Sequence, residues 1–190
     1  MASTKIVTGK HTVFSYLHAL EPKVPMGDGT PKYSVSLIIP KSDTVTVAKI
    51  KAAIEAAYEE GKSKLRDSKG RIPTLKELEA DKKCPLHDGD AKGDPAYKDS
   101  YYVNATSVTP PGIVDANRED ILDRNEIYSG IIGRASINFY VYNKNGNKGI
   151  GCGLNHLQKL ADGTPLNGRT TAQEDFADLD DDEDDDDFLS

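Results

Sequence analysis

Two tyrosines and two cationic residues alternate with apolar residues in the segment 134–144. Such alternation is typical of a half-buried β-strand, because side chains two residues apart lie on the same face of a strand. Aromatic rings stack on unpaired nucleobases and cations neutralise phosphates, so the polar face predicts a contact surface for single-stranded nucleic acid. Tyrosine is also common in sheets for packing reasons, and the segment alone leaves that interpretation open. The predicted outward residues are Arg134, Ser136, Asn138, Tyr140, Tyr142 and Lys144.

Three further residues in neighbouring segments are candidates for the same surface. In the strand predicted at Ser100–Ser107, Tyr102 shares a row with polar residues and should face outward. Tyr16 is a candidate as well, although neither row of its strand is clearly apolar. Lys32 begins another strand and is a candidate phosphate contact, whereas Tyr33 lies on the apolar row of that strand and is predicted to be buried.

The sequence shows little that is typical of a metal or cofactor site. Cys84 and His87 have a ligand-like spacing, but zinc needs a second pair of ligands, and Cys152 with His156 is too isolated to supply one. The run Gly149–Gly153 lacks the strand–loop–helix context of a dinucleotide-binding loop. It is better interpreted as a strand with a bulge or with a closely approaching backbone. We therefore predict no catalytic residue, no metal and no cofactor.

Three aspartates, Asp88, Asp90 and Asp94, keep one enzymatic alternative open, that of a metal-dependent nuclease. Their spacing does not match a calcium-binding loop. They also lie among glycine and proline, where aspartate commonly forms turns. A nuclease would degrade a labelled strand once magnesium is added, and a binding protein would not.

The charge of the chain is divided unevenly along its length. The 190 residues include 24 Lys and Arg against 31 Asp and Glu, a formal net charge of -7 that would repel nucleic acid. Eleven of the acidic residues lie in residues 174–190, which contain no Lys or Arg. Residues 1–173 therefore carry about +4. The sequence predicts a mildly basic body followed by a strongly acidic tail.

The acidic tail is predicted to be disordered, because a run of eight consecutive acidic residues repels itself and has little apolar area to bury. An apolar group after a polyanion is typical of a docking peptide, and the polyanion could also occupy a basic groove in place of DNA. A scaffold protein whose tail is its only working part is the second alternative. The residues expected to contact partners are Asp184, Asp185, Asp186, Asp187 and Phe188.

Patterns along the chain predict mostly strands and one long helix. A helix with Ser42 or Asp43 as its N-cap is expected over residues 44–66, and its apolar stripe should pack on a core. Residues 67–99 form a long polar excursion with one short helical pattern, and Asn145-Gly146 predicts a hairpin turn. The strands are expected at residues 11–20, 32–39, 100–107, 113–114, 131–143 and 149–157.

These elements predict a mainly β fold, namely a small antiparallel barrel with one packed α-helix. We expect one domain over residues 1–173 and a separate tail over residues 174–190. No apolar run is long enough to span a bilayer, the first residues do not form a signal peptide, and two cysteines cannot build a disulfide framework. A protein of a reducing cytoplasm, with no membrane partner, is expected.

Several segments of the chain carry a combined signal that no single motif carries. They are Ser15-Tyr16, Pro31–Asp43, Tyr97–Ala105, Tyr128–Gly130, Phe139–Asn143, Gly149–Asn155, Gln158, Asp162-Gly163 and Asp175-Phe176. In this order they run through nearly all of residues 5–176 and resemble the single-stranded-DNA-binding proteins of tailed bacteriophages and prophages.

This resemblance implies an OB barrel that coats single-stranded DNA during phage replication and recombination. It implies that the acidic tail recruits replication and recombination proteins, and self-association as a dimer or a cooperative array on DNA is a further option. A preference for DNA over RNA follows from the resemblance alone, because stacking on tyrosine does not sense a 2′-hydroxyl. The choice of contact residues rests on strand alternation instead.

Overall fold

The computed structural model describes residues 3–24 and 29–166. The long strands of this part of the chain form a barrel. Eight strands, two α-helices and four short 3-10 helices (η) make up this part of the chain. In order they are β1 Lys5–Val7, β2 Thr12–Lys23, β3 Lys32–Pro40, α1 Thr44–Gly61, η1 Lys62–Leu65, α2 Leu75–Ala80, β4 Leu86–Asp88, η2 Gly89–Lys92, η3 Pro95–Tyr97, β5 Ser100–Ser107, β6 Gly112–Val114, η4 Arg124–Glu126, β7 Ile132–Lys144 and β8 Asn147–Ala161.

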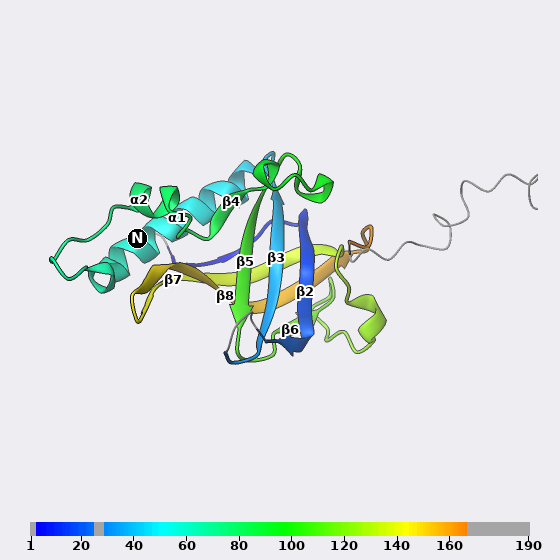
Figure 1. Ribbon diagram of the computed structural model, residues 1–190. Helices are drawn as coiled ribbons and strands as arrows, with labels where there is room; N and C mark the ends of the chain where they lie inside the picture. Colours follow the sequence, from blue (N-terminus) through cyan, green and yellow to red (C-terminus); the bar gives the residue numbers. More distant parts are fainter. Residues whose placement is uncertain (1–2, 25–28, 167–190) are drawn as a thin grey trace, which may run out of the picture.

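Five long strands close into a ring in the order β7-β2-β3-β5-β8, and β8 returns to β7 (Figure 1). This closure confirms the predicted OB-like barrel. The hairpin between β7 and β8 turns at Asn145 and Gly146, which have φ of 54° and 89°. Both residues therefore adopt the left-handed conformation that two-residue hairpin turns require. In contrast to a wholly antiparallel barrel, β8 runs parallel to β5 and to β6, so the ring is of mixed direction.

Helix α1 covers one end of the barrel and completes its core (Figure 1). Asp43 is its N-cap and accepts a hydrogen bond from the backbone N–H of Thr46. The predicted stripe is buried, with Ile50 wholly so, because these side chains pack against the inward residues of the strands. Among the described residues, no helix is long and apolar enough to cross a membrane.

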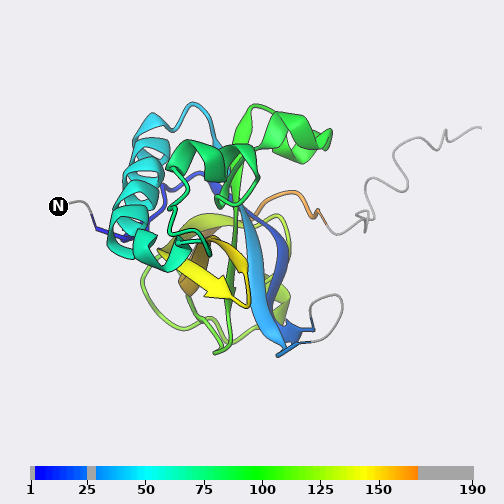
Figure 2. The ribbon, with the colours of Figure 1, turned by 60° about the vertical axis from the view of Figure 1, so that its left-hand side comes forward.

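The polar excursion at residues 67–99 is folded against the barrel. Figure 2 shows α2 beside α1, whereas the green segment with η2 and η3 stands apart from α1, and η2 and η3 contact β5. Strand β4 pairs with β5, so that His87 lies opposite Tyr102. Tyr97 is wholly buried, and its hydroxyl donates to Ser36 Oγ at 3.1 Å. These contacts hold the excursion against the outer faces of β3 and β5.

Ion pairs between Lys41 and two aspartates also hold the excursion against the barrel. The ammonium group of Lys41 lies 2.9 Å from the Asp88 carboxylate and 2.7 Å from that of Asp90. These contacts lower the pKa of both carboxyl groups, with the hydrogen bond from Lys41 as the largest cause. Because Lys41 directly follows β3, these ion pairs join the excursion to the edge of the barrel.

Candidate nucleic-acid interface

The predicted alternation of β7 is confirmed. Its inward residues Ala135, Ile137, Phe139 and Val141 are all buried in the core. Tyr140 lies on the opposite face and is 41 % exposed. The rest of that face is exposed or half-buried, so β7 presents the outward row of aromatic and polar residues that its sequence indicates.

The outward row of β7 lies across a row of glycines in β8. Tyr142 is paired with Gly149, Tyr140 with Gly151 and Asn138 with Gly153. The intervening residues of β8 are buried in the core, so these three glycines face outward with their partners. The rings of the two tyrosines thus rest on a strand that has no side chains on that face.

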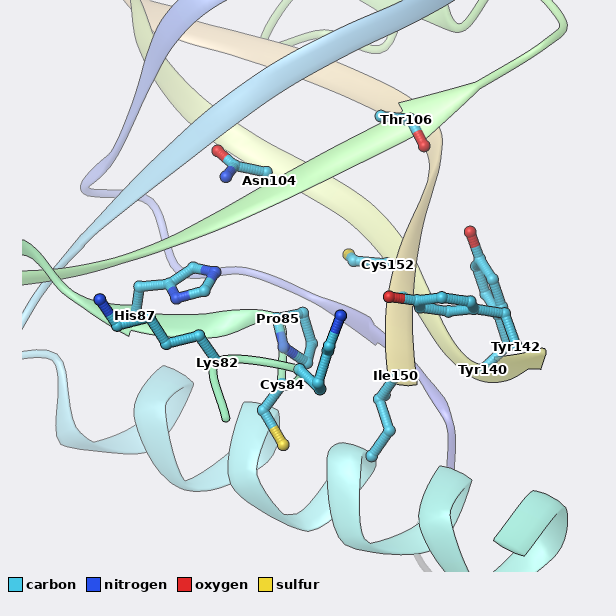
Figure 3. Close-up of a pocket in the computed structure, with 12 residues that line it drawn as sticks. Lys82, Cys84, Pro85, His87, Asn104, Thr106, Tyr140, Tyr142, Ile150 and Cys152 are labelled. Atoms are coloured by element: carbon cyan, nitrogen blue, oxygen red, sulfur yellow. The ribbon is translucent and has the colours of Figure 1, made fainter. Parts of the chain in front are cut away.

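A groove of about 220 Å³ lies between these tyrosines and the excursion. Figure 3 shows its lining side chains, which come from the excursion and from the three strands β5, β7 and β8. The groove brings the predicted aromatic residues of β7 together with polar residues of β5 and with basic residues that precede and form β4. Its principal polar side chains are Tyr140, Tyr142, Asn104, Thr106, Lys82 and His87.

The basic residues of the excursion were not among the predicted contacts. Lys82 and His87 line the groove directly. The pKa of His87 lies below its usual value, mainly because of burial and further because of the positive charges of Lys82 and Lys92. The only signal for these residues in the sequence was the unusual length of the polar excursion, which is typical of a functional segment.

Lys92 lies at the centre of a cluster of aromatic rings next to the groove. Its ammonium group is 4.4 Å from the ring centre of Tyr97, 5.0 Å from that of Tyr102 and 5.0 Å from that of Tyr16. These distances are within the range of cation–π attraction. The Tyr102 ring also lies 5.0 Å from the His87 ring. Tyr102 therefore faces outward as predicted, within a basic and aromatic surface.

Tyr16 reaches this cluster because β2 is irregular at that point. The pairing of β2 with β3 shifts register between Ser15 and His18. Tyr16 has a φ of 45° and is 57 % exposed, whereas Phe14, two residues earlier, is wholly buried. In a regular strand both would lie on one face. The irregularity sends Phe14 into the core and Tyr16 to the surface beside Lys92.

The remaining predicted phosphate contacts do not line the groove. Arg134 is exposed near the start of β7, opposite Gln158, and Lys144 is exposed at the hairpin end, opposite Asn147. Lys32 begins β3, opposite Lys23 of β2. Tyr33, which was expected in the core, is half-buried, because it lies near the end of β3 opposite Ser107.

The three aspartates of the nuclease alternative have structural roles. Asp88 caps η2 and accepts from the backbone N–H of Asp90, while Asp94 caps η3 and accepts from that of Ala96. Asp90 accepts from the backbone N–H of Asp99 at 2.8 Å. Between residues 3 and 24 and between 29 and 166, no three His, Cys, Asp or Glu side chains are grouped to hold a metal ion.

The two cysteines are buried and free. Figure 3 shows Cys84 directed toward α1, away from His87, so the two do not converge as zinc ligands. Burial raises the pKa of Cys84 to about 11 and raises that of Cys152 further above its ordinary value. Both thiols are therefore protonated at neutral pH. The predicted partner contacts Asp184, Asp185, Asp186, Asp187 and Phe188 lie outside the described residues.

The sequence matches one protein family over almost its whole length. Residues 4–189 match the family described as Enterobacter phage Enc34, ssDNA-binding protein. A curated relative, putative protein p50 of Acyrthosiphon pisum secondary endosymbiont phage 1, is 31% identical over 163 residues, which is 84% of this chain and 85% of the relative.

Solved structures share the fold. The single-stranded DNA-binding protein from bacteriophage Enc34, C-terminally truncated, superposes with a TM-score of 0.69 at 22% identity, covering 86% of this chain and 88% of that one. The same phage protein in complex with ssDNA gives 0.67 at 24% identity, covering 86% and 89%. Gp2.5, a single-stranded DNA-binding protein of bacteriophage T7, gives 0.52 at 16% identity, covering 93% and 95%.

Proposed function

The chain belongs to the family of the single-stranded-DNA-binding protein of Enterobacter phage Enc34, and from this premise we propose that it binds single-stranded DNA in the groove between β7 and the excursion. The observation that carries this location is the meeting of Tyr140 and Tyr142 with Lys82 and His87 in one groove. Members of this class bind and do not catalyse, and the chain is not an enzyme.

In the proposed mechanism, bases stack on the exposed rings while cations follow the phosphates. Tyr140 and Tyr142 stand two residues apart on β7, a spacing of about 7 Å that suits two nucleotides of an extended strand. Burial raises the pKa of Tyr140, which keeps its ring neutral. Tyr102 and Tyr16 extend the stacking surface past Lys92. Such contacts read the faces of bases and not their edges, so little sequence preference is expected.

Cations outside the groove would guide the strand as it enters and leaves. The neutral Asn138 of β7 would add a hydrogen bond without a charge, whereas among the cations Lys144 lies past Tyr142 at the hairpin, Arg134 lies along β7 and Lys32 lies at the start of β3. Each is placed to meet phosphates of a strand longer than the groove. Their contribution would appear in the salt dependence of binding, because released counterions accompany every neutralised phosphate.

The acidic tail would regulate this site. We take residues 1–173 as the DNA-binding domain and residues 174–190 as a separate tail, whose eleven acids are complementary to the basic groove. The tail would compete with DNA, and Asp184–Asp187 with Phe188 would recruit replication and recombination proteins once DNA displaces it. The protein would act in the host cytoplasm, as a monomer, a dimer or a cooperative array.

A fluorescence anisotropy titration tests the proposed function. The probe is a labelled oligo-dT strand, with an unlabelled strand and its duplex as competitors over a series of salt concentrations. We expect the single strand to bind more tightly than the duplex, and log affinity to fall with log salt by about 0.7 per phosphate neutralised. A scaffold protein would show no binding at any salt concentration, and a nuclease would shorten the strand when magnesium is added.

A further inference from the structure

The glycines of β8 are not required by backbone conformation. Gly149, Gly151 and Gly153 lie in a regular strand, and none of them has a positive φ. Glycine in a strand interior normally weakens the strand, because it loses more conformational freedom on folding and offers no side chain to pack. Their presence at three alternate positions therefore calls for a cause outside the backbone.

The cause lies in the side chains that cross β8 from β7. A Cβ on Gly151 would stand 2.8 Å from Cζ, 2.9 Å from Cε2 and 3.0 Å from the hydroxyl oxygen of Tyr140. These are the three nearest atoms, and all belong to one tyrosine side chain. A Cβ on Gly149 would stand 2.8 Å from the Tyr142 hydroxyl, and one on Gly153 would stand 2.7 Å from Asn138 Oδ1.

Gly151 is the one of the three glycines at which a single rigid side chain excludes a Cβ. At Gly149 the carbonyl oxygen of Lys83 is as close to the added Cβ as the Tyr142 hydroxyl is, so backbone packing also excludes a side chain there. At Gly153 the neighbour is the end of a flexible amide. At Gly151 the neighbour is a rigid ring that cannot shorten, so an added methyl group must lift the ring away from β8.

We propose that Gly151 is a positioning residue of the DNA interface, which lets the Tyr140 ring lie across β8 with its other face turned to the groove. This inference rests on the proposed function. A ring held in this way is oriented before DNA arrives, so less conformational freedom is lost on binding. An alanine at position 151 would push the ring into the groove, which Gly151 and Tyr140 line together.

A double-mutant cycle tests the proposal. Oligo-dT affinity and the thermal midpoint are measured for the wild-type chain, Gly151→Ala, Tyr140→Ala and the double variant. We expect Gly151→Ala to weaken binding by about tenfold in the wild-type background and to have no further effect when Tyr140 is already alanine. If Gly151→Ala lowers the thermal midpoint, Tyr140→Ala should restore it in the double variant. A Tyr140→Phe background should keep the full effect, since two of the three close atoms are ring carbons.

Two results would overturn the proposal. An equal loss of affinity from Gly151→Ala in both backgrounds would show that the methyl group acts on β8 and not on the ring. Unchanged affinity of Gly151→Ala would show that the ring needs no glycine beneath it. Failure of the proposed function is distinguishable from both, because Tyr140→Ala itself would then bind oligo-dT as tightly as the wild-type chain, and the inference would fall with it.

Discussion

The ammonium group of Lys92 lies 5.0 Å from the centre of the Tyr102 ring, which joins the polar excursion to the barrel strand β5. The same ammonium group reaches Tyr16 of β2 and Tyr97 of the excursion itself. One cation therefore lies among rings from three separate segments. This relationship makes the excursion a part of the proposed binding surface and not an appendage beside it.

Replacing Lys92 with alanine should weaken binding and reduce its salt dependence. The variant removes one cation that can meet a phosphate, so the slope of log affinity against log salt should become shallower by about 0.7. The control is Lys49→Ala, which removes the same charge from the exposed face of α1. Equal slopes for the two variants would place Lys92 outside the interface.

Replacing Tyr140 and Tyr142 with alanine should weaken oligo-dT binding while the fold is retained. Each lost stack should cost on the order of 1–3 kcal/mol, whereas phenylalanine at the same positions should keep most of the affinity. The control is Tyr58→Ala on α1, a tyrosine whose hydroxyl bonds to the carbonyl of Pro73 away from the groove. Full affinity in the alanine double variant, with unaltered circular dichroism, would contradict the assigned face.

Binding should strengthen as the pH falls from about 7.5 to about 5.5. In the free protein the pKa of His87 is held below its usual value by burial and by two lysines. A nearby phosphate would raise that pKa, so the complex takes up a proton and gains affinity as the pH falls. His87→Gln should lose this part of the pH dependence, and His11→Gln, at an exposed turn, should keep it. Identical pH profiles for His87→Gln and the wild-type chain would refute the assignment.

Tyr16 offers a substitution that separates stability from binding. Its φ of 45° is in a region that costs a residue with a Cβ about 1–2 kcal/mol relative to glycine. Tyr16→Gly should therefore be more stable in urea than Tyr16→Ala by about 1 kcal/mol. Both variants should lose affinity for oligo-dT to the same extent, because both lack the ring. An alanine variant as stable as the glycine variant would show that the strain is absent.

Removal of residues 174–190 should tighten DNA binding at low salt. The truncation deletes eleven acidic residues and leaves about +4 on the remaining chain. The gain should diminish as salt rises, because screening weakens competition between the tail and DNA. Addition of the tail as a separate peptide should reverse the gain. A truncated chain with the affinity of the full chain at every salt concentration would exclude competition by the tail.

The barrel could be predicted because its strands carry local signals. Alternation in Lys32–Ile39 and in residues 134–144 identified their inward faces, and Asn145-Gly146 identified the hairpin. These signals depend only on neighbours along the chain. The two tyrosines of β7 could be assigned to the outer face for the same reason, and the structure places them there.

The side of the groove that the excursion forms could not be predicted, because it depends on contacts between residues that are distant in the sequence. Nothing local indicates that His87 pairs with Tyr102 or that Lys92 reaches Tyr16, which is 76 positions earlier in the chain. The exposure of Tyr16 was equally hidden, because an irregularity in β2 overrides the alternation that would place it with Phe14. The glycines of β8 were expected to mark a close approach, but the approaching groups are mostly side chains of β7.

Photo-crosslinking locates bound single-stranded DNA relative to the groove between β7 and the excursion. An oligonucleotide of about 20 nucleotides containing iodouracil, longer than the site of one OB barrel, is irradiated with the wild-type chain and the crosslinked peptides are identified by mass spectrometry. We predict crosslinks at Tyr140, Tyr142 and Tyr102. Crosslinks confined to Tyr33, Tyr58 or Tyr128 would place the DNA on another face of the barrel.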